Sequence, residues 1–331
     1  MEMIGLAHSD LVVSRLCFGC WGIISDQHWG RRDADQSIAT IRAALDVGIQ
    51  FFDTAAMYGD GESERLLGQA LRACRDEVVI ASKLPLDKMR PDEIPEACNA
   101  TLERLGTDYL DLYQTHWTSR ETPPAESWEA LLKLKQEGKV RAVGVCNMGV
   151  GDLGEICSLE PPATNQVPYS LLWRAIEWEI LPYCREHDIG VLAYSPLMHG
   201  LLAGKYRTAQ DVPDGRARTR HFSAARPQTR HGEPGCEAET FAAIDAIRAI
   251  AERLGRPMAD VALAWCAQQP GVACVIAGAS SPEQVRQNAA PFENPLPEDA
   301  IRELTDATER LRQTLGANPD MWEGQQKSRY R

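Results

Sequence analysis

The sequence IQFFDTAAMYG, residues 49–59, joins a short apolar run to two polar side chains. The run ends in Asp53, and Tyr58 follows in a turn of small residues. This pattern is typical of a buried strand that opens into a loop. In barrels of alternating strands and helices, the loops that follow the strands carry the catalytic groups. The stretch therefore predicts an α/β fold with a functional site at the end of this strand.

Two later apolar runs end in the same way, VVIASK at residues 78–83 and YLDLYQTH at residues 109–116. The polar residues found where these three runs end are, in chain order, Asp53, Tyr58, Lys83 and His116. Each of them alone has an ordinary structural explanation, such as a loop cap, a core ring or an ion pair. Their joint placement at the ends of three successive strands favours a catalytic centre.

Strand and helix patterns alternate along the whole chain. Strands are predicted at residues 15–19, 49–53, 77–82, 109–116, 140–145, 163–167, 189–194 and 272–276. Helices are predicted at residues 34–47, 62–74, 91–105, 125–136, 176–187, 239–253 and 257–268. The repeat predicts a (β/α)8 TIM barrel formed by residues 1–331 as a single domain. An N-terminal hairpin and two extra helices after the last strand complete the predicted fold.

A doubly wound parallel sheet is the alternative architecture. It would place a Gly-x-Gly-x-x-Gly turn directly after the first strand, and CFGCWG at residues 17–22 does not supply one. A dinucleotide, if one binds, is therefore not held in the manner of a doubly wound domain.

The net charge of −12 and the pI near 5.1 argue against nucleic acid or an anionic membrane as a partner, because a polyanion would be repelled. The sequence does not open with a basic segment followed by an apolar one. No stretch approaches the roughly 18 to 20 apolar residues that span a bilayer. We expect a cytoplasmic protein whose partners are small molecules.

Ten cysteines in 331 residues are sparse beside the roughly 8–10% of short secreted disulfide scaffolds, so reduced thiols are expected. Cys17 and Cys20 have the spacing of half a zinc site, but no second pair completes the ligand set. No metal site is predicted.

Short motifs surround the four polar residues: FDTA at 52–55, YG at 58–59, GESE at 61–64 and LG at 67–68. With the four polar residues, these motifs resemble the first signature and the catalytic tetrad of the aldo-keto reductase superfamily. The resemblance extends over nearly the whole chain. Three further motifs are similar to its bacterial and potassium-channel-β-subunit-like branch: GCW at 19–21, YSPL at 194–197 and GASS at 278–281.

The resemblance implies reversible reduction of an aldehyde or ketone by hydride transfer. A carbonyl that accepts hydride develops negative charge on its oxygen and needs a proton donor there. Tyr58 would be that acid, and the base in the reverse direction, although the ordinary tyrosine pKa of about 10 makes it a weak donor. Lys83, held charged by Asp53, would lower that pKa. His116 would donate to the same oxygen and orient the substrate.

The resemblance also implies NADPH as the cofactor. NADH is possible, because residues 278–288 lack the lysine and arginine that hold the 2′-phosphate in some branches. Cys146 stands where the family usually has serine, and a thiol is a weaker donor than a hydroxyl. The cofactor contacts implied are Gly19, Trp21, Cys146, Asn147, Gln166, Tyr194, Ser195, Leu197, Gly200, Lys205, Arg218, Gly278, Ser280, Gln284 and Asn288.

Residues 205–236 carry six arginines and little hydrophobic periodicity. Two explanations stay open, a solvated loop that balances acidic neighbours or a flap over an anionic ligand, since guanidinium groups bind phosphate well. The resemblance adds the prediction that this loop covers the cofactor and that Arg218 contacts it.

The polar C-terminal tail, residues 316–331, is expected either to be loose or to fold near the barrel mouth. Specificity in such barrels resides in the loops after the strands. The expected lining of the substrate pocket, for a small polar or sugar-like carbonyl, is Trp21, Trp29 and Trp117.

Two other functions remain open. The channel-subunit resemblance permits a regulatory or scaffold subunit that binds NADPH and turns over slowly, although an intact tetrad disfavours it. An aldolase that forms a Schiff base on Lys83 is also possible in a barrel.

Overall fold

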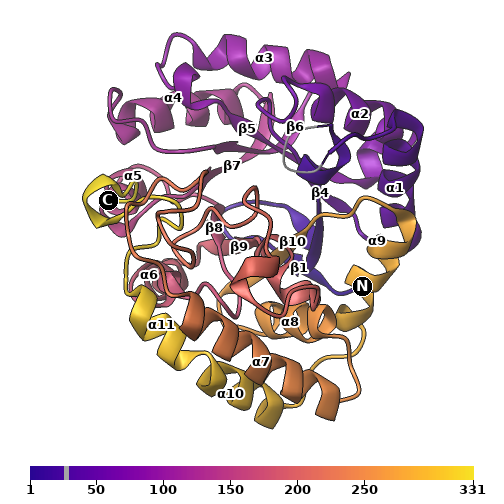
Figure 1. Cartoon of the computed structure of the whole chain (residues 1–331). Coiled ribbons are helices and arrows are strands. Elements are labelled where there is room, and N and C mark those ends of the chain that lie inside the picture. The colour runs from indigo at the N-terminus through magenta and orange to yellow at the C-terminus, as the bar shows by residue number, and fades with distance from the viewer. Residues whose placement is uncertain (26–29) are drawn as a thin grey trace.

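The computed structural model describes residues 1–25 and 30–331 of the chain. Eight parallel strands close into a barrel in the order β10-β3-β4-β5-β6-β7-β8-β9, and helices surround it (Figure 1). The strands are β3 (Leu16–Gly19), β4 (Phe51–Asp53), β5 (Val79–Leu84), β6 (Leu110–Thr115), β7 (Val140–Cys146), β8 (Thr164–Pro168), β9 (Gly190–Tyr194) and β10 (Val272–Ala277). The predicted (β/α)8 barrel is confirmed.

The predicted N-terminal hairpin is present as β1 (Met3–Gly5) paired antiparallel with β2 (Val12–Ser14). The hairpin region buries Leu6, Leu11 and Val13 in one apolar cluster with residues from the barrel strands, including Phe51 at the start of β4. Because these side chains close the amino end of the barrel, a ligand site inside the strands has to open at the carboxyl end.

The helices agree with the sequence prediction in position but not everywhere in extent. They are α1 (Ala34–Asp46), α2 (Glu62–Leu71), α3 (Ile94–Leu105), α4 (Pro124–Gln136), α5 (Val150–Cys157), α6 (Ile180–Glu186), α7 (Glu237–Arg253), α8 (Met258–Ala267), α9 (Pro282–Ala289), α10 (Glu298–Ala307) and α11 (Glu309–Leu315).

Three differences have local causes. Helix α5 was not predicted, because it has eight residues, two of them glycine, and shows no long apolar period. Three helices rather than two follow β10, since α9 is short and predominantly polar. Helix α3 begins at Ile94 rather than at Pro91, and its first turn contains Pro95 instead.

The register of the parallel strands places the polar residues at one end of the barrel. Gly19 of β3 pairs with Asp53 of β4, which pairs with Ala81 of β5. Lys83 lies two residues beyond Ala81 and therefore projects from the same face of its strand. The two charged side chains consequently meet at the carboxyl end of the sheet.

Two segments outside the barrel contact one another. Between η5 (Met198–Ala203) and α7, the chain forms one further short helix, η6 (Ala209–Asp211). The buried side chain of Arg220, in this segment, donates to the carbonyl oxygens of Leu315 and Asn318 at 2.8 and 3.0 Å.

No helix in the described parts of the chain has the length and apolar character needed to cross a membrane.

Gly68 tests the packing of α2 on α3. A Cβ atom at Gly68 would collide with the backbone carbonyl of Leu105, which cannot swing away as a flexible side chain can. We expect Gly68→Ala to lower the free energy of unfolding by about 1–3 kcal/mol, the usual cost of overpacking. Denaturant unfolding measures this change. Gly5→Ala is the control, since no atom lies within 4 Å of the added carbon, and equal stability losses in both variants would contradict the packing.

Candidate active site

Lys83 is the centre of a buried hydrogen-bonded group. Its side chain lies at the end of β5 and the residue is 1% exposed. The ammonium donates to Asp53 Oδ2 at 2.6 Å, to the Thr54 carbonyl oxygen at 2.8 Å and to the Tyr58 hydroxyl oxygen at 3.2 Å. All three ammonium hydrogens therefore have acceptors, which is the condition under which a buried lysine stays charged.

Asp53 and its neighbours keep this lysine ionised. Burial by itself would lower the pKa of Lys83, but the negative charge of Asp53 outweighs burial and raises the pKa above its ordinary value. The second carboxylate oxygen of Asp53 accepts a hydrogen bond from Gln166 Nε2 at 2.7 Å. Both oxygens are thus engaged, so the carboxylate is fixed in position.

The ring of Tyr58 lies between two other aromatic side chains. Its centroid is 6.1 Å from that of Trp21, in a nearly parallel arrangement, and 5.9 Å from that of His116, edge to face. Because Lys83 donates to the hydroxyl oxygen, the hydroxyl hydrogen remains available to another acceptor. The predicted juxtaposition of the four tetrad residues is therefore present.

Burial and the charge of Lys83 act on the Tyr58 pKa in opposite directions. Burial raises this pKa to about 12, although Lys83 acts in the lowering direction. The lowering effect expected of Lys83 is present, but the cost of burying a phenolate exceeds the attraction of an ammonium already paired with Asp53. The hydroxyl is consequently protonated throughout the neutral range and is a donor before any ligand arrives.

His116 is a neutral imidazole in this site. Burial, with the nearby charge of Lys83 as a second cause, lowers its pKa to about 3. A neutral imidazole has one N–H donor and one acceptor nitrogen, so His116 can donate a hydrogen bond without adding a second positive charge beside Lys83.

Amide side chains collect at the ends of β7 and β8, as predicted. Asn147 and Gln166 are 3% and 4% exposed, and the Asn147 backbone N–H donates to the Gln166 carbonyl at 2.9 Å. The Asn147 backbone adopts a left-handed φ of 56°, which is rare for a residue other than glycine and recurs at functional sites. Tyr194, at the end of β9, donates its hydroxyl to Asn147 Oδ1 at 2.8 Å. Cys146 is buried beside them.

The loop after β9 has the unusual backbone expected of an anion-binding turn. Ser195 and His199 have φ values of 55° and 52°, and Gly200 has 94°. Left-handed turns of this kind can form anion-binding concavities from backbone N–H groups. Here the Met198 and Gly200 N–H groups donate to the Ser195 and Leu197 carbonyl oxygens, each at 2.9 Å, and so hold the turn in shape. Leu197 is half-buried in this loop, whereas Lys205 follows it and is exposed.

The predicted adenosine-side residues also lie together. Gly19 and Gly278 approach so closely that a Cβ on Gly278 would lie 3.2 Å from the Gly19 carbonyl oxygen. The Gln284 side-chain oxygen accepts from both the backbone N–H and the hydroxyl of Ser280, at 2.8 and 3.0 Å. Asn288 Nδ2 donates to the Gly278 carbonyl at 3.2 Å. Helix α9 therefore presents its first turn and these polar side chains beside the barrel mouth.

The arginines of residues 205–236 have different environments. Arg220, Arg226 and Arg230 form ion pairs with Glu233, Asp214 and Glu323. All three balance acidic neighbours, as one of the two explanations had it, but Arg220 is buried rather than solvated. Arg216 donates to the His199 carbonyl at 2.9 Å and so ties the segment to the loop after β9. Arg218 is half-buried near these residues in the chain.

The C-terminal tail lies over the barrel mouth, which was one of the two expectations. In Figure 1 the yellow end of the chain packs beside α5. Trp117 contacts three side chains of the tail: the Trp322 ring at 6.2 Å, the Tyr330 ring at 6.0 Å and the Arg329 guanidinium at 3.5 Å, measured to ring centroids. The sequence-based site omitted these three residues. The presence of Trp322 and Tyr330 in a mostly polar tail was the sequence signal that could have indicated their place in the site.

Trp29, also predicted in the pocket, lies outside the described residues.

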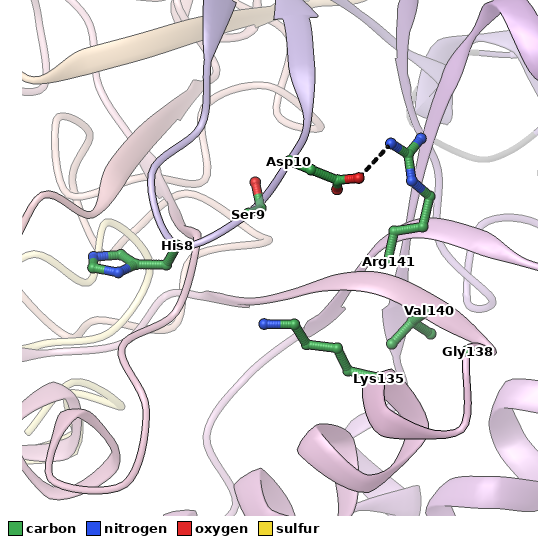
Figure 2. A pocket seen from close by; sticks show the side chains of 7 residues that line it. All are labelled: His8, Ser9, Asp10, Lys135, Gly138, Val140 and Arg141. Atoms are coloured by element: carbon green, nitrogen blue, oxygen red, sulfur yellow. Dashed lines mark hydrogen bonds and ion pairs between the residues drawn. The ribbon is translucent and has the colours of Figure 1, made fainter.

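A surface hollow at the opposite end of the barrel is unrelated to this group. Figure 2 shows it lined by residues that include Asp10 of the hairpin region and Val140 and Arg141 at the start of β7. Asp10 and Arg141 form an ion pair at 3.2 Å there. The tetrad lies at the carboxyl ends of the strands, so the candidate active site is at the other mouth.

The fold and the site together define a closed eight-stranded parallel barrel in which a tyrosine hydroxyl is hydrogen-bonded to a buried, ion-paired lysine. Residues 15–309 match the model of the Aldo/keto reductase family. The chain belongs to this family. It is 34% identical over 336 residues to the NADH-specific methylglyoxal reductase of Escherichia coli (strain K12), covering 94% of this chain and 100% of that protein.

Other relatives extend this picture. A protein of Oryza sativa subsp. japonica named "Probable voltage-gated potassium channel subunit beta" is 30% identical, over 87% of this chain and 90% of its own length. The glycerol dehydrogenase AKR11B4 from Gluconobacter oxydans superposes with a TM-score of 0.79 at 32% identity, covering 93% and 95% of the two chains. An aldo-keto reductase from Klebsiella pneumoniae in complex with NADPH gives a TM-score of 0.69 at 32% identity, covering 90% and 92%.

The low pKa of His116 gives a testable titration. We expect the imidazole NMR signals of His116 to stay constant between about pH 5 and pH 8, where an ordinary histidine titrates. The unfolded chain binds this proton near the ordinary histidine pKa of about 6.5, whereas the folded chain binds it only near 3. The His116 contribution to stability is therefore lost as the pH falls through that window.

The matched variant is His116→Asn, assigned by the loss of one imidazole signal. It should show a smaller decrease in unfolding free energy between about pH 6.5 and pH 4 than the unchanged protein. A His116 titration midpoint between about pH 6 and pH 7 would contradict the buried, neutral imidazole.

Proposed function

We propose that the protein is an NADPH-dependent carbonyl reductase that reversibly converts an aldehyde or ketone to an alcohol, with Tyr58 as the general acid. The observation that carries the proposal is the hydrogen bond from Lys83 to the Tyr58 hydroxyl at 3.2 Å, with Lys83 itself bound to Asp53 at 2.6 Å. This arrangement leaves a protonated phenol with its hydrogen free, beside a fixed positive charge.

The chain's own side chains account for the proton transfer. NADPH, when bound, supplies the hydride. As the carbonyl carbon accepts that hydride, charge accumulates on the carbonyl oxygen, and Tyr58 donates its proton there. The phenolate that remains is stabilised by Lys83, which keeps its own proton because Asp53 neutralises it. His116, neutral and edge-on to Tyr58, donates a second hydrogen bond to the same oxygen.

The residues around the tetrad have the chemistry that a nicotinamide dinucleotide needs. Buried amides of Asn147 and Gln166 suit a carboxamide, and the half-buried Tyr194 ring suits a planar heterocycle. The left-handed turn at 195–200 suits the diphosphate. The first turn of α9, with Ser280 and Gln284, suits the adenosine phosphate.

NADPH is the proposed cofactor, and NADH is the second candidate. The Klebsiella pneumoniae relative was crystallised with NADPH, whereas the Escherichia coli relative is named as NADH-specific. Residues 278–288 supply hydroxyl and amide groups, and the one arginine in this stretch, Arg286, is paired with Glu283 at 3.8 Å. Arg218 and Lys205 are the proposed sources of positive charge along the diphosphate.

The proposed substrate is a small polar carbonyl. Relatives are named for methylglyoxal reduction and for glycerol dehydrogenation, both involving short oxygenated carbon chains. Trp21 lies beside Tyr58, and Trp117 lies beside Trp322 of the tail. Indole faces pack well on the carbon face of a polyol.

A regulatory subunit that binds NADPH with slow turnover is the second candidate, supported by the name of the rice relative. The complete hydrogen-bonded tetrad favours an enzyme over this alternative. A Schiff-base aldolase is disfavoured, because a nucleophilic Lys83 must be uncharged and Asp53 instead raises its pKa.

Replacing the proposed acid tests the mechanism. We expect Tyr58→Phe to reduce NADPH-dependent reduction of methylglyoxal by about 100- to 10,000-fold, because the proton donor is lost. NADPH binding should change by less than about threefold, since the ring remains. Absorbance at the nicotinamide band measures the first quantity and tryptophan fluorescence the second.

Tyr109→Phe is the matched control, because it removes a phenol hydroxyl at the start of β6, at the other end of the barrel. Equal activity in the Tyr58 variant and the unchanged protein would exclude Tyr58 as the acid. Binding of NADPH without turnover of any carbonyl compound by the unchanged protein would favour the regulatory subunit.

Cys146 tests the proposed carboxamide site. Its thiol is buried at the end of β7, beside Asn147, and burial raises its pKa, so it remains a weak donor rather than a thiolate. We expect Cys146→Ser to tighten NADPH binding by about 3- to 10-fold, the effect of one better hydrogen bond. Cys98→Ser, buried on α3, is the control. Unchanged or weaker binding in the Cys146 variant would place the carboxamide elsewhere.

A further inference from the structure

The end of the tail is folded back on itself around one buried carboxylate. Asp320 is 0% exposed. It accepts hydrogen bonds from the Arg329 guanidinium at 2.7 and 2.8 Å and from the Trp322 backbone N–H at 3.1 Å. Because Asp320 binds both ends of the intervening loop, residues 322–329 form a closed loop that directs Tyr330 toward the barrel.

The last residues are fastened to the first turn of α5. The Gly151 backbone N–H donates to the Arg331 carbonyl oxygen at 2.9 Å, and Arg331 Nε pairs with Asp152 at 2.8 Å. A Cβ atom on Gly149 would collide with the Arg331 backbone. The absence of a side chain at Gly149 is therefore what lets the tail approach α5 closely.

This docking brings a second phenol to Asn147. The Tyr330 hydroxyl donates to Asn147 Oδ1 at 2.8 Å, the same oxygen and the same distance as for Tyr194. On the other side of the amide, Asn147 Nδ2 donates to the His116 carbonyl at 3.1 Å. A backbone carbonyl only accepts, so this contact fixes which end of the amide is nitrogen.

The oxygen of the Asn147 side-chain amide thus has all its hydrogen-bond donors, whereas its nitrogen can still donate to a ligand. Two phenol hydroxyls use both lone pairs of Oδ1. Burial keeps the pKa of Tyr330 well above its ordinary value, so its hydroxyl remains a proton donor. Within the part of the chain that the structure describes, one hydrogen of Nδ2 is bonded to His116 and the other remains for a ligand acceptor.

We propose that Tyr330 is a positioning residue for the cofactor: together with Tyr194, it fixes the Asn147 amide so that its N–H is presented to the carboxamide oxygen of the nicotinamide. The inference rests on the proposed function, since it assigns a role to that carboxamide. Tyr330 acts through Asn147, from a position 183 residues away in the chain. Its removal lets the amide rotate and weakens only the nicotinamide part of cofactor binding.

The experiment compares two ligands on the full chain. NADPH carries the nicotinamide, whereas 2′-phospho-ADP-ribose has the same adenosine, phosphates and ribose without it. For Tyr330→Phe we expect the Kd for NADPH to rise about 3- to 10-fold, the effect of one lost hydrogen bond, and the Kd for 2′-phospho-ADP-ribose to stay within about twofold. Calorimetric titration measures both without turnover. Tyr109→Phe is the control for loss of a distant phenol.

Gly149→Ala is a second variant, which keeps Tyr330 in the sequence. Its added Cβ atom would collide with the Arg331 backbone and so prevent the end of the tail from docking on α5. It should produce the same ligand selectivity, a weaker NADPH complex with an unchanged fragment complex. Equal weakening for both ligands would overturn the inference in favour of a general structural role. Tighter NADPH binding by Tyr330→Phe would also overturn it, because the phenol would then compete with the cofactor. Failure of the unchanged protein to bind either ligand contradicts the proposed function, and this inference with it.

Discussion

The ion pair between Lys83 and Asp53 is the interaction on which the rest of the site depends. Removing either partner of a buried pair typically costs about 3–5 kcal/mol, because the other charge is left without compensation. Here both partners make further hydrogen bonds: Lys83 also donates to the Thr54 carbonyl and to Tyr58, and Asp53 also accepts from Gln166. The barrel holds this pair because adjacent parallel strands deliver both side chains to one interior face. Positioning of the Tyr58 hydroxyl and of the Gln166 amide thus follows from a single charged contact.

A second centre, Asn147, connects the proposed catalytic group to parts of the chain that are distant in sequence. Its side chain bonds to the backbone of His116, to Tyr194 on β9 and to Tyr330 in the tail. None of these contacts carries net charge, and each alone contributes only about 0.5–1.5 kcal/mol. Their combined effect is orientational, since together they determine which way one amide faces. The site therefore combines a strong electrostatic core with a weaker network that sets geometry at the proposed cofactor.

The sequence predicted the features that depend on strand ends and failed on those that depend on three-dimensional surroundings. The tetrad was predictable because a parallel barrel brings the carboxyl ends of its strands to one rim, so chain order and apolar runs suffice. The lowering effect of Lys83 on the Tyr58 pKa was predictable, whereas the larger, opposing effect of burial was not, because only the packed site decides how deeply the ring is buried. Helix α5 is too short and glycine-rich to show a period. Trp322 and Tyr330 lie in a polar tail whose docking depends on a fold around the buried Asp320 and on close approach to Gly149, which is distant in sequence.

The measurement that tests the central claim most directly is a crystal structure of the protein with NADP⁺ bound. The account predicts a carboxamide within hydrogen-bonding distance of Asn147 and Gln166, a nicotinamide ring whose reactive carbon faces the Tyr58 hydroxyl, and an adenosine phosphate beside Ser280 and Gln284. The Asp53–Lys83 contact should be retained. A dinucleotide bound away from Tyr58, for example at the hollow beside Asp10 and Arg141, would contradict the account, as would a nicotinamide ring separated from the tetrad.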